Sequence, residues 1–535
     1  MEFDSLHHPF CSRRATVYAK NGMVATSQPL AAQAGLAVLR NGGNAIDAAI
    51  ATAACLTVVE PTSNGIGGDA FALVWTHGTL HGLNASGPAP ESLSIAAVKK
   101  AGHDKMPRHG LTPVTVPGAP AAWAELSGRF GRLPLQEVLQ PAIQYAEEGY
   151  PVSPTLGKYW QAAYNNYSEH LKGAEFGAWF DTFAPHGRAP RIGEVWRSPG
   201  HARTLFEIAH SGARSFYEGE LSVKIDQFCR SHGGYLSRED LRRYAPEWVE
   251  PIRAQYRGYD VWEIPPNGQG LVALIALQIL EQFSFAQKDS ADALHLQIEA
   301  VKLAFADGLA YITDARDMAV RVEDLLARDY AKQRSGLIGD RAGNPSPGKP
   351  EMGGTVYLAT ADGEGNMVSY IQSNYMGFGS GIVVPETGIS LQNRGQTFSL
   401  NPEDANALAP GKKTYHTIIP GFLTKGDQAV GPFGVMGGFM QPQGHVQVIM
   451  NAIDFKLNPQ AALDAPRWQW RSGRKVEVER GVPEHVVQAL ARKGHEISVA
   501  LDSGGFGRGQ IIWRDEAGVL AGGTEPRTDG AVAAW

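Results

Sequence analysis

The first sixty residues carry the clearest pattern of apolar and polar positions. Between a helix-start signal at Pro29 and a glycine-rich stop at residues 41–43, apolar side chains recur at helical spacing, which predicts a helix. Asn44 then stands where it can cap a second helix. The apolar run 45–59 that follows is rich in alanine, is interrupted by Asp47 and is too short to span a bilayer. We therefore expect it to form a buried helix.

The rest of the chain mixes both kinds of periodicity. Further helices are expected at residues 119–130, 135–148, 268–283, 291–311 and 445–453. Segments rich in β-branched and aromatic residues predict strands at 252–257, 259–264, 414–419, 430–435, 475–478, 497–501 and 510–514. Strands dominate the last third, and no internal repeat is visible. The pattern predicts a chain of mixed α and β structure.

The amino-acid composition of the sequence changes sharply at Thr355. Residues 339–354 hold several glycines and prolines, a composition that suits an exposed loop and cannot sustain a helix. Directly afterwards, residues 355–361 read as a strand, 362–366 as a turn and 367–373 as a returning strand. Thr355 is therefore the first residue of a predicted hairpin.

A threonine in this position can serve as a nucleophile if the chain is cut in front of it. Its hydroxyl needs a neighbouring base, and a new α-amine with a pKa of about 7.7–8.0 can supply one. Before the cut, the same hydroxyl can attack the carbonyl of Gly354 to form an ester that water opens, and two preceding glycines permit the strained backbone that this requires. An ordinary strand start after a loop is the alternative interpretation of this local pattern.

Further motifs in a fixed order favour the nucleophile. They lie at residues 42–49, 64–69, 116–120, 353–355, 378–381 and 437–438. On these motifs the chain resembles the γ-glutamyltranspeptidase family from about Ala25 to its C-terminus. The resemblance implies one domain with the fold of a four-layer αββα sandwich, of the α+β class. It also implies a proenzyme cut into a large fragment, 1–354, and a small fragment, 355–535, with 339–354 as the cleavage loop and catalysis through an acyl ester on the threonine.

The resemblance assigns roles to three more residues. Gly437 and Gly438 match a glycine pair whose amide N–H groups stabilise the oxyanion, although a plain turn before a helix would also use glycine. Ser373 falls where the family has a second threonine that hydrogen-bonds the nucleophile, and a serine hydroxyl can do the same. A strand hydroxyl facing solvent is the alternative for Ser373.

The chain departs from the family at the residues that recognise the acyl donor. In the family, an arginine and a serine pair hold the α-carboxylate of the substrate, while an aspartate and an asparagine engage its α-ammonium. By position relative to the matched motifs, these residues fall on Ser86, on Lys412 and Lys413, on Thr397 and on Tyr375. None of the five is retained. Arg394, in turn, replaces a neutral glutamine.

This change of charge alters the expected substrate. Without its aspartate partner, a buried substrate ammonium loses about 2–5 kcal/mol of binding free energy. Arg394 can bind a carboxylate bidentately, so an acyl chain that ends in an acid and lacks the amine suits the site, as in cephalosporin or glutaryl acylases and oxamate-type amidohydrolases. A structural ion pair is the alternative for Arg394. Donors of the γ-glutamyl type remain a competing hypothesis, and an uncut binding protein without activity is the non-enzymatic one.

Composition narrows the partners and the compartment. The chain has 535 residues, a net charge of −6 and a pI near 6.3, so we expect no binding to nucleic acid or to a membrane surface. Cys11, Cys55 and Cys229 are widely separated, which favours neither a disulfide framework nor zinc, and we expect a reducing compartment. Residues 1–20 are charged and lack an apolar core, so we expect no signal peptide and a cytoplasmic location. The expected partners are a small amide substrate and the two fragments themselves.

Two other patterns are weaker. His295 and Glu299 share a helix face without the spacing of a zinc-binding His-Glu-x-x-His motif, and we expect neither a metal nor another cofactor. The stretch 502–505 is similar to the surroundings of a serine-protease nucleophile, but nothing else in the sequence follows that fold.

Overall fold

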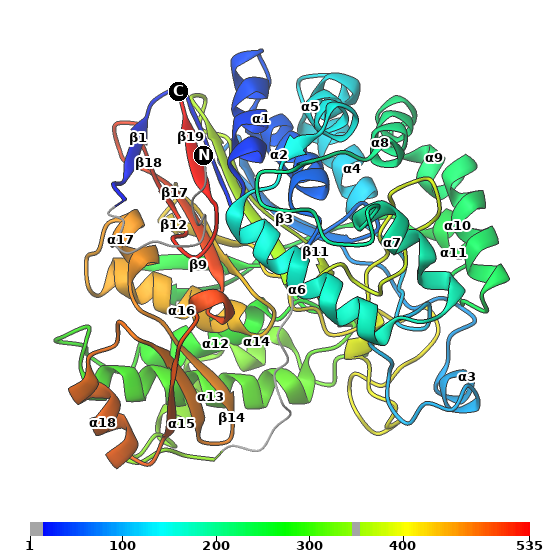
Figure 1. Ribbon diagram of the computed structural model, residues 1–535. Coiled ribbons are helices and arrows are strands. Elements are labelled where there is room, and N and C mark those ends of the chain that lie inside the picture. Colours follow the sequence, from blue (N-terminus) through cyan, green and yellow to red (C-terminus); the bar gives the residue numbers. More distant parts are fainter. Residues whose placement is uncertain (1–13, 345–353) are drawn as a thin grey trace.

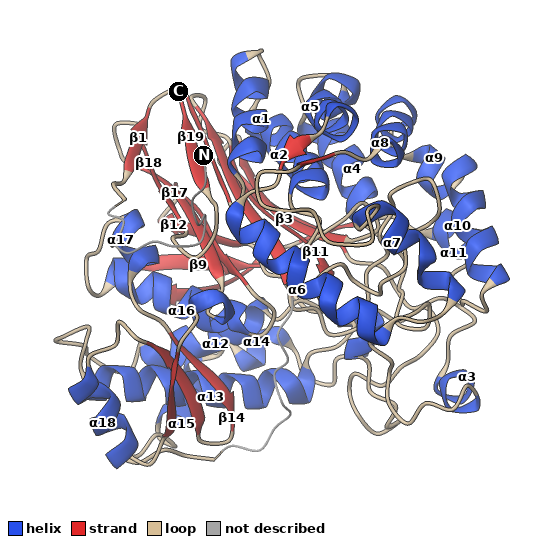
Figure 2. Ribbon diagram, viewed as in Figure 1, coloured by secondary structure: helices blue, strands red, loops and turns tan. Residues whose placement is uncertain are grey.

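The computed structural model describes residues 14–344 and 354–535. Two antiparallel β-sheets of seven strands each face one another, and helices cover both outer faces (Figures 1 and 2). In spatial order, the first sheet contains β1 (Val17–Ala19), β18 (Leu520–Thr524), β17 (Arg508–Arg514), β13 (Gln428–Met436), β12 (Gly421–Lys425), β9 (Tyr259–Glu263) and β8 (Ile252–Tyr256). The second contains β19 (Ala531–Ala534), β2 (Gly22–Thr26), β10 (Gly354–Asp362), β11 (Met367–Tyr375), β3 (Asp69–Thr76), β4 (Thr79–Ala85) and β7 (Glu247–Val249).

The helices divide between the two faces. On the side of the second sheet lie α1 (Pro29–Arg40), α2 (Ala45–Val59), α4 (Ala119–Phe130), α5 (Leu135–Glu148), α6 (Pro154–His170), α7 (Gly177–Phe183), α8 (Pro199–Ser211), α9 (Arg214–Tyr217), α10 (Glu220–Ser231) and α11 (Arg238–Arg243), with α3 (Ile95–Lys100) farther out. On the side of the first sheet lie α12 (Gly270–Leu280), α13 (Ala291–Tyr311), α14 (Val322–Leu325), α15 (Arg328–Ser335), α16 (Met440–Ile453), α17 (Pro459–Asp464) and α18 (Glu484–Arg492). Smaller sheets join β5 (Tyr150–Pro151) to β6 (Val195–Trp196), and β14 (Trp468–Ser472) to β15 (Lys475–Glu479) and β16 (Glu496–Ala500).

The hydrophobic core follows these layers and confirms the expected αββα architecture. One large hydrophobic cluster joins the second sheet to the helices on its outer face. A second cluster joins α12, α13 and α16 to the first sheet, and a third fills the space between the two sheets. Along β10, Val356 and Leu358 belong to the helical cluster, while Tyr357 and Ala359 belong to the cluster between the sheets. The central hairpin is therefore buried on both faces, and so are the polar residues that it carries.

Most of the predicted elements are present. Asn44 caps α2 through its side-chain oxygen, which accepts from the amides of Ile46 and Asp47 at 3.0 Å, and the whole of α2 is buried as expected. The strand predicted at 414–419 is wrong. That segment is a loop with one isolated bridge, between His416 and Gly268, and its polar side chains point into the site described below. The helix expected at 445–453 begins earlier, at Met440.

Both sheets combine strands from before residue 354 with strands that follow it. In the second sheet, β2 lies between β19 and β10, and β11 pairs with β3. In the first sheet, β1 pairs with β18 at one side and β12 pairs with β9 at the other. Both sheets therefore depend on both parts of the chain. No helix among the described residues has the length and apolarity that a membrane span requires.

A buried polar group holds the backbone that leads toward Thr355. Glu299 accepts from the amide of Gly343 at 3.0 Å, while Lys302 donates to the carbonyl of the same residue at 3.3 Å and pairs with Glu299 at 2.7 Å. His295 contacts the carbonyl oxygen of Gly339 at 2.8 Å. Both side chains that hold Gly343 come from α13, so this helix anchors residues 339–343 of the segment that leads toward Thr355.

This anchor predicts different effects for two neighbouring glycines, neither of which has a left-handed backbone. A methyl group at Gly343 would lie 2.8 Å from Oε2 of Glu299, whereas one at Gly339 would meet open space. We expect Gly343→Ala to destabilise the protein by about 1–3 kcal/mol relative to Gly339→Ala, because it displaces a buried, bonded carboxylate. Calorimetric melting of the two variants measures the difference, and equal melting temperatures would contradict the anchor.

Candidate active site

Thr355 is fully buried at the start of β10, beside the end of β11. The register of the hairpin shifts here, because Val356 pairs with Gln372 but Gly354 pairs with Tyr375. Two residues of β11 therefore oppose one residue of β10, as in a β-bulge. The bulge places the hydroxyl of Thr355 3.1 Å from that of Ser373, as the resemblance implies.

The carbonyl of Gly354 is the focus of this arrangement. Its oxygen accepts from the Thr355 hydroxyl at 2.8 Å and from the Ser373 hydroxyl at 2.7 Å. The amide of Tyr375 donates to Ser373 Oγ at 2.8 Å and fixes the orientation of that hydroxyl. Tyr375 itself has a φ of 72°, a conformation that costs a non-glycine residue about 1–3 kcal/mol and is concentrated at functional sites.

These contacts fit an acyl shift at the Gly354–Thr355 bond. Thr355 Oγ1 would bond to the Gly354 carbonyl carbon, the C–N bond would break, and the hydroxyl proton would pass to the departing amine of Thr355. Negative charge would collect on the carbonyl oxygen, where Ser373 already donates a hydrogen bond. Water would then open the ester and leave Thr355 as a new N-terminus with its own amine as base.

Glycines in two of the sequence motifs permit close backbone contacts, one against this hairpin and one within the segment that follows β11. A side chain at Gly68 would meet the carbonyl oxygen of Ser373 at 2.7 Å, and one at Gly379 would meet that of Leu391 at 2.4 Å. Asn64 accepts from the side-chain amide of Gln372 at 2.8 Å, which joins its loop to the residue before Ser373. The motifs therefore serve to pack the backbone around the hydroxyl pair.

Gly437 and Gly438 lie between β13 and α16, with φ values of 136° and 60°. Among the described residues, neither amide N–H donates a hydrogen bond, so both are available to an oxyanion. The side chain of Gln269 donates to the carbonyl of Gly438 at 2.9 Å and also to that of Thr417. This residue links the glycine pair to the charged group described next.

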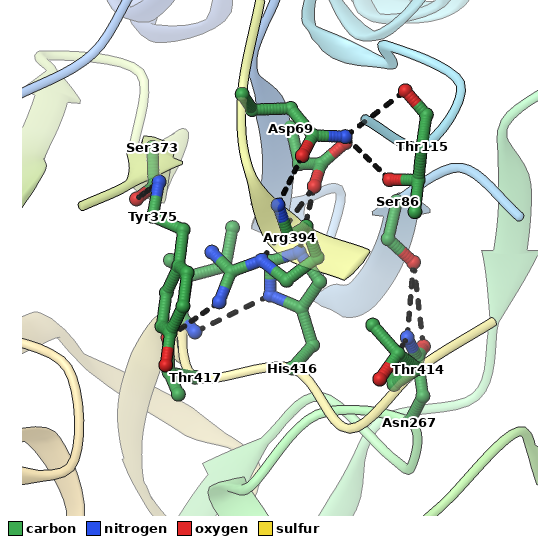
Figure 3. Close-up of polar contacts among 12 residues, drawn as sticks. Asp69, Ser86, Thr115, Asn267, Ser373, Tyr375, Arg394, Thr414, His416 and Thr417 are labelled. Atoms are coloured by element: carbon green, nitrogen blue, oxygen red, sulfur yellow. Dashed lines mark hydrogen bonds and ion pairs between the residues drawn. The ribbon is translucent and has the colours of Figure 1, made fainter. Parts of the chain in front are cut away.

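Arg394 lies in a fully buried polar group that includes Tyr375, Asp69, His416 and Thr417 (Figure 3). Its guanidinium carbon is 4.4 Å from the centre of the Tyr375 ring, and its Nη1 donates to Thr417 Oγ1 at 2.7 Å. On the other side, its Nε is 3.8 Å from Asp69 Oδ2, which is also 3.0 Å from His416 Nε2. Because Tyr375 is the cross-strand partner of Gly354, this group lies next to the bond expected to be cut.

Burial is the largest influence on the pKa values of the ionisable side chains Asp69, Arg394 and His416 in this group. It raises the pKa of Asp69 to about 7, although Arg394 and Lys413 oppose the shift. Burial also lowers the pKa of Arg394 to about 10, with Asp69 opposing, which leaves the guanidinium charged near neutrality. The pKa of His416 falls well below its usual value, first through burial and then through Arg394 and Lys413, so the imidazole is neutral.

The other residues predicted to contact substrate make contacts of their own. Ser86 donates to Asn84 at 2.7 Å, and Thr397 donates to the carbonyl of Arg394 at 2.8 Å, so it steadies the turn that carries the arginine. Lys412 donates to the carbonyl of Ala405, and its Nζ is 3.6 Å from an Asp317 carboxylate oxygen; Lys413 pairs with Glu247 at 2.8 Å. The charged ends of both lysines thus pair with exposed carboxylates, and Lys413 also lies close enough to Asp69 and His416 to shift their pKa values.

Sequence reasoning missed Asp69, His416 and Thr417 as members of the site. Asp69 carried a visible signal, because it is the one charged residue at the head of the otherwise apolar strand β3 and directly follows a glycine pair. His416 and Thr417 were hidden within the segment predicted as a strand. Their contribution depends on the bridge between residues 268 and 416, which no local pattern indicates.

A second buried group, His295, Glu299 and His495, has the ligand types of a metal site. His295 is engaged at both nitrogens, by His495 at 2.8 Å and by the carbonyl of Gly339 at 2.8 Å. Lys302 Nζ pairs with Glu299 and would repel a cation. We interpret this group as part of the anchor for residues 339–343. A cleft of about 1240 Å³ lies at the turn end of β10 and β11, away from Thr355.

The hydrogen bond from Ser373 to the Gly354 carbonyl predicts a specific defect. We expect Ser373→Ala to slow self-cleavage by about 10²-fold or more, because one donor to the developing oxyanion is lost, whereas Ser373→Thr keeps the donor. Ser369→Ala is the matched control, since it removes another buried β11 hydroxyl, one that bonds Tyr357 instead. Denaturing gels of freshly purified protein over time report the rates, and equal rates for the two alanine variants would refute the role.

Comparison with known proteins agrees with this geometry. The sequence profile of the family described as gamma-glutamyltranspeptidase matches residues 31–535. The glutathione hydrolase-like YwrD proenzyme of Bacillus subtilis is 37% identical over 96% of this chain and 99% of its own length, and the oxamate amidohydrolase proenzyme of Klebsiella pneumoniae is 35% identical over 96% and 98%. The crystal structure of a cephalosporin acylase from Bacillus halodurans superposes with a TM-score of 0.98 at 66% identity, covering 100% of this chain and 99% of that one. The chain belongs to the γ-glutamyltranspeptidase family and is an amidohydrolase proenzyme of that family.

Proposed function

We propose that this protein cuts itself between Gly354 and Thr355 and then hydrolyses or transfers the acyl group of carboxyacyl amides through an ester on Thr355. The observation that carries the first part is the contact of the Thr355 hydroxyl with the Gly354 carbonyl at 2.8 Å, with Ser373 on the same oxygen. The fragments would be 1–354 and 355–535. Gly437 and Gly438 would stabilise the oxyanion in both steps, because their amides donate to no other group within residues 14–344 and 354–535.

The preference for a carboxyacyl group rests on Arg394. Its Nε and Nη2 make no hydrogen bond to any described residue, although the side chain is 1% exposed. A buried guanidinium with two unused donors on one edge has the geometry to take a carboxylate bidentately. The relative named oxamate amidohydrolase supports this preference, because oxamate is an amide whose acyl group carries a carboxylate.

A γ-glutamyl donor is the competing substrate. It would bring an α-ammonium in addition to its carboxylate, and Arg394 together with a neutral His416 gives that ammonium an unfavourable environment. Asp69 is the one carboxylate in this group that could oppose the repulsion, and it already faces Arg394. Because a glutathione hydrolase-like relative is 37% identical to this chain, γ-glutamyl amides are included among the substrates to be tested.

The nucleophile is tested by replacement of Thr355. We expect Thr355→Ala to give a single uncut chain with no amidase activity, because the change removes the hydroxyl needed for cleavage and for catalysis. Thr355→Ser keeps a hydroxyl and a future α-amine, so it should retain part of both. A denaturing gel and an anilide assay measure the two outcomes. Normal cutting of Thr355→Ala, or an active uncut wild type, would overturn the proposal; an uncut, inactive wild type would support a binding protein.

Substrate preference is tested on Arg394. We expect the cut wild type to cleave a glutaryl anilide with kcat/KM at least comparable to that of the γ-glutamyl anilide. Arg394→Gln should lower the glutaryl value ten- to a hundredfold, the equivalent of about 1.5–3 kcal/mol for a charge-assisted hydrogen bond, while self-cleavage persists. Lys412→Gln is the control, because its ammonium pairs with the exposed Asp317. A wild-type preference for γ-glutamyl amides by orders of magnitude would refute the carboxyacyl assignment.

A further inference from the structure

Arg394 and Asp69 form an incomplete ion pair inside the protein. The two side chains are 1% and 0% exposed, yet Nε of Arg394 and Oδ2 of Asp69 are 3.8 Å apart, too far for a hydrogen bond. Nε and Nη2 of the arginine remain unused among the described residues. Figure 3 shows the guanidinium between the Tyr375 ring on one side and Asp69 with His416 on the other. The unused edge is therefore close to an anion that does not occupy it.

Asp69 is held in place from a different direction. The amide of Ile418 donates to Nδ1 of His416 at 3.4 Å, so Nε2 carries the ring hydrogen and donates to Asp69 Oδ2 at 3.0 Å. His416 is neutral because burial lowers its pKa. The neutral histidine orients the carboxylate without cancelling its charge, which leaves Asp69 as the counter-ion of Arg394.

The other ionisable groups that face Asp69 do not replace it. Lys413 lies on the loop that carries His416, and its ammonium pairs with Glu247. Tyr217 and Tyr244 face Asp69 from the helical side, and burial raises the pKa of both well above the usual value, so they stay neutral. Tyr375 stacks on the guanidinium. Among the described groups, one carboxylate therefore balances one guanidinium.

A second carboxylate bound at Nε and Nη2 of Arg394 would add a negative charge that no further cation in this group balances. Two carboxylates that share one buried guanidinium repel each other, and such a pair relieves the repulsion by taking up one proton. We propose that Asp69 is the positioning residue of the acyl-carboxylate site and that a substrate carboxylate binds Arg394 together with one proton, which Asp69 accepts. This inference rests on the proposed function.

The affinity for a carboxyacyl ligand should fall as the pH rises above 7. Burial raises the pKa of Asp69 to about 7 in the free protein, and a bound carboxylate raises it further. Below pH 7 the proton is already present, so affinity for a carboxyacyl ligand is constant. Above pH 7 the proton must be taken from water, so affinity falls by about tenfold for each pH unit until the pKa of the bound state is passed. A neutral ligand of the same shape lacks this dependence.

The experiment measures competitive inhibition of the cut wild type by glutaramate, the monoamide of glutaric acid, and by its neutral diamide between pH 5.5 and 9. We expect the inhibition constant of glutaramate to rise about tenfold per pH unit above pH 7 relative to that of the diamide. In Asp69→Asn the two profiles should run parallel, with glutaramate at pH 8 bound at least tenfold more tightly than in the wild type. Asp427→Asn, which removes an exposed carboxylate at the turn end of the sandwich, should match the wild type.

The outcomes separate this inference from the proposed function. If Arg394→Gln weakens glutaramate but the wild-type profiles of the two ligands are parallel, the proton coupling is wrong and the carboxyacyl site stands. If Arg394→Gln leaves glutaramate binding unchanged at every pH, the site itself is wrong. A pH slope that survives in Asp69→Asn assigns the proton to another group and overturns the role of Asp69. Should Asp69→Asn fail to cut itself, the two wild-type profiles still decide the coupling.

Discussion

The shared hydrogen bonding of the Gly354 carbonyl by Thr355 and Ser373 is the interaction on which the site depends. It exists because the hairpin β10–β11 is buried on both faces, so that its polar groups must find partners within the protein. The bulge at Thr355, the positive φ of Tyr375 and the close approach of the Gly68 loop all serve this contact. The hydroxyl that we propose as the nucleophile is thus held by the packing of a buried hairpin.

The relatives show what this arrangement leaves free to vary. Proteins named as a glutathione hydrolase-like proenzyme, an oxamate amidohydrolase and a cephalosporin acylase share the family or the fold with this chain. Chemistry at the threonine demands an acyl carbonyl and an amide, whatever the rest of the acyl chain carries. Under the proposed function, differences in substrate arise in the part of the site that meets the distal end of the acyl group, and we propose that in this chain the buried guanidinium of Arg394, with Asp69 as its counter-ion, forms that part.

Sequence reasoning succeeded where local patterns are decisive. The capped helix after Asn44, the hairpin of Thr355 and its pairing with Ser373 followed from periodicity, turn residues and the resemblance to a family. It failed for residues 414–419, whose β-branched and aromatic residues favour a strand but whose backbone instead bonds to Asn267 and Gln269. It also gave no indication that Lys412 and Lys413 pair with Asp317 and Glu247, or that Asp69 faces Arg394. The pairing of buried charges depends on contacts between distant segments, and spacing along one sequence does not record them.

Because both sheets combine strands from the two sides of residue 354, a cut there would affect how the protein unfolds. A break in the chain there would not divide the fold into two bodies, because β2 stays hydrogen-bonded between β19 and β10, and β9 stays bonded to β12. Separation of the fragments would therefore require both sheets to unravel. Folding before the cut is a unimolecular process, but refolding afterwards would need two chains to meet. The cut enzyme would persist through the height of its unfolding barrier rather than through a reversible equilibrium, and each molecule that unfolds would be lost.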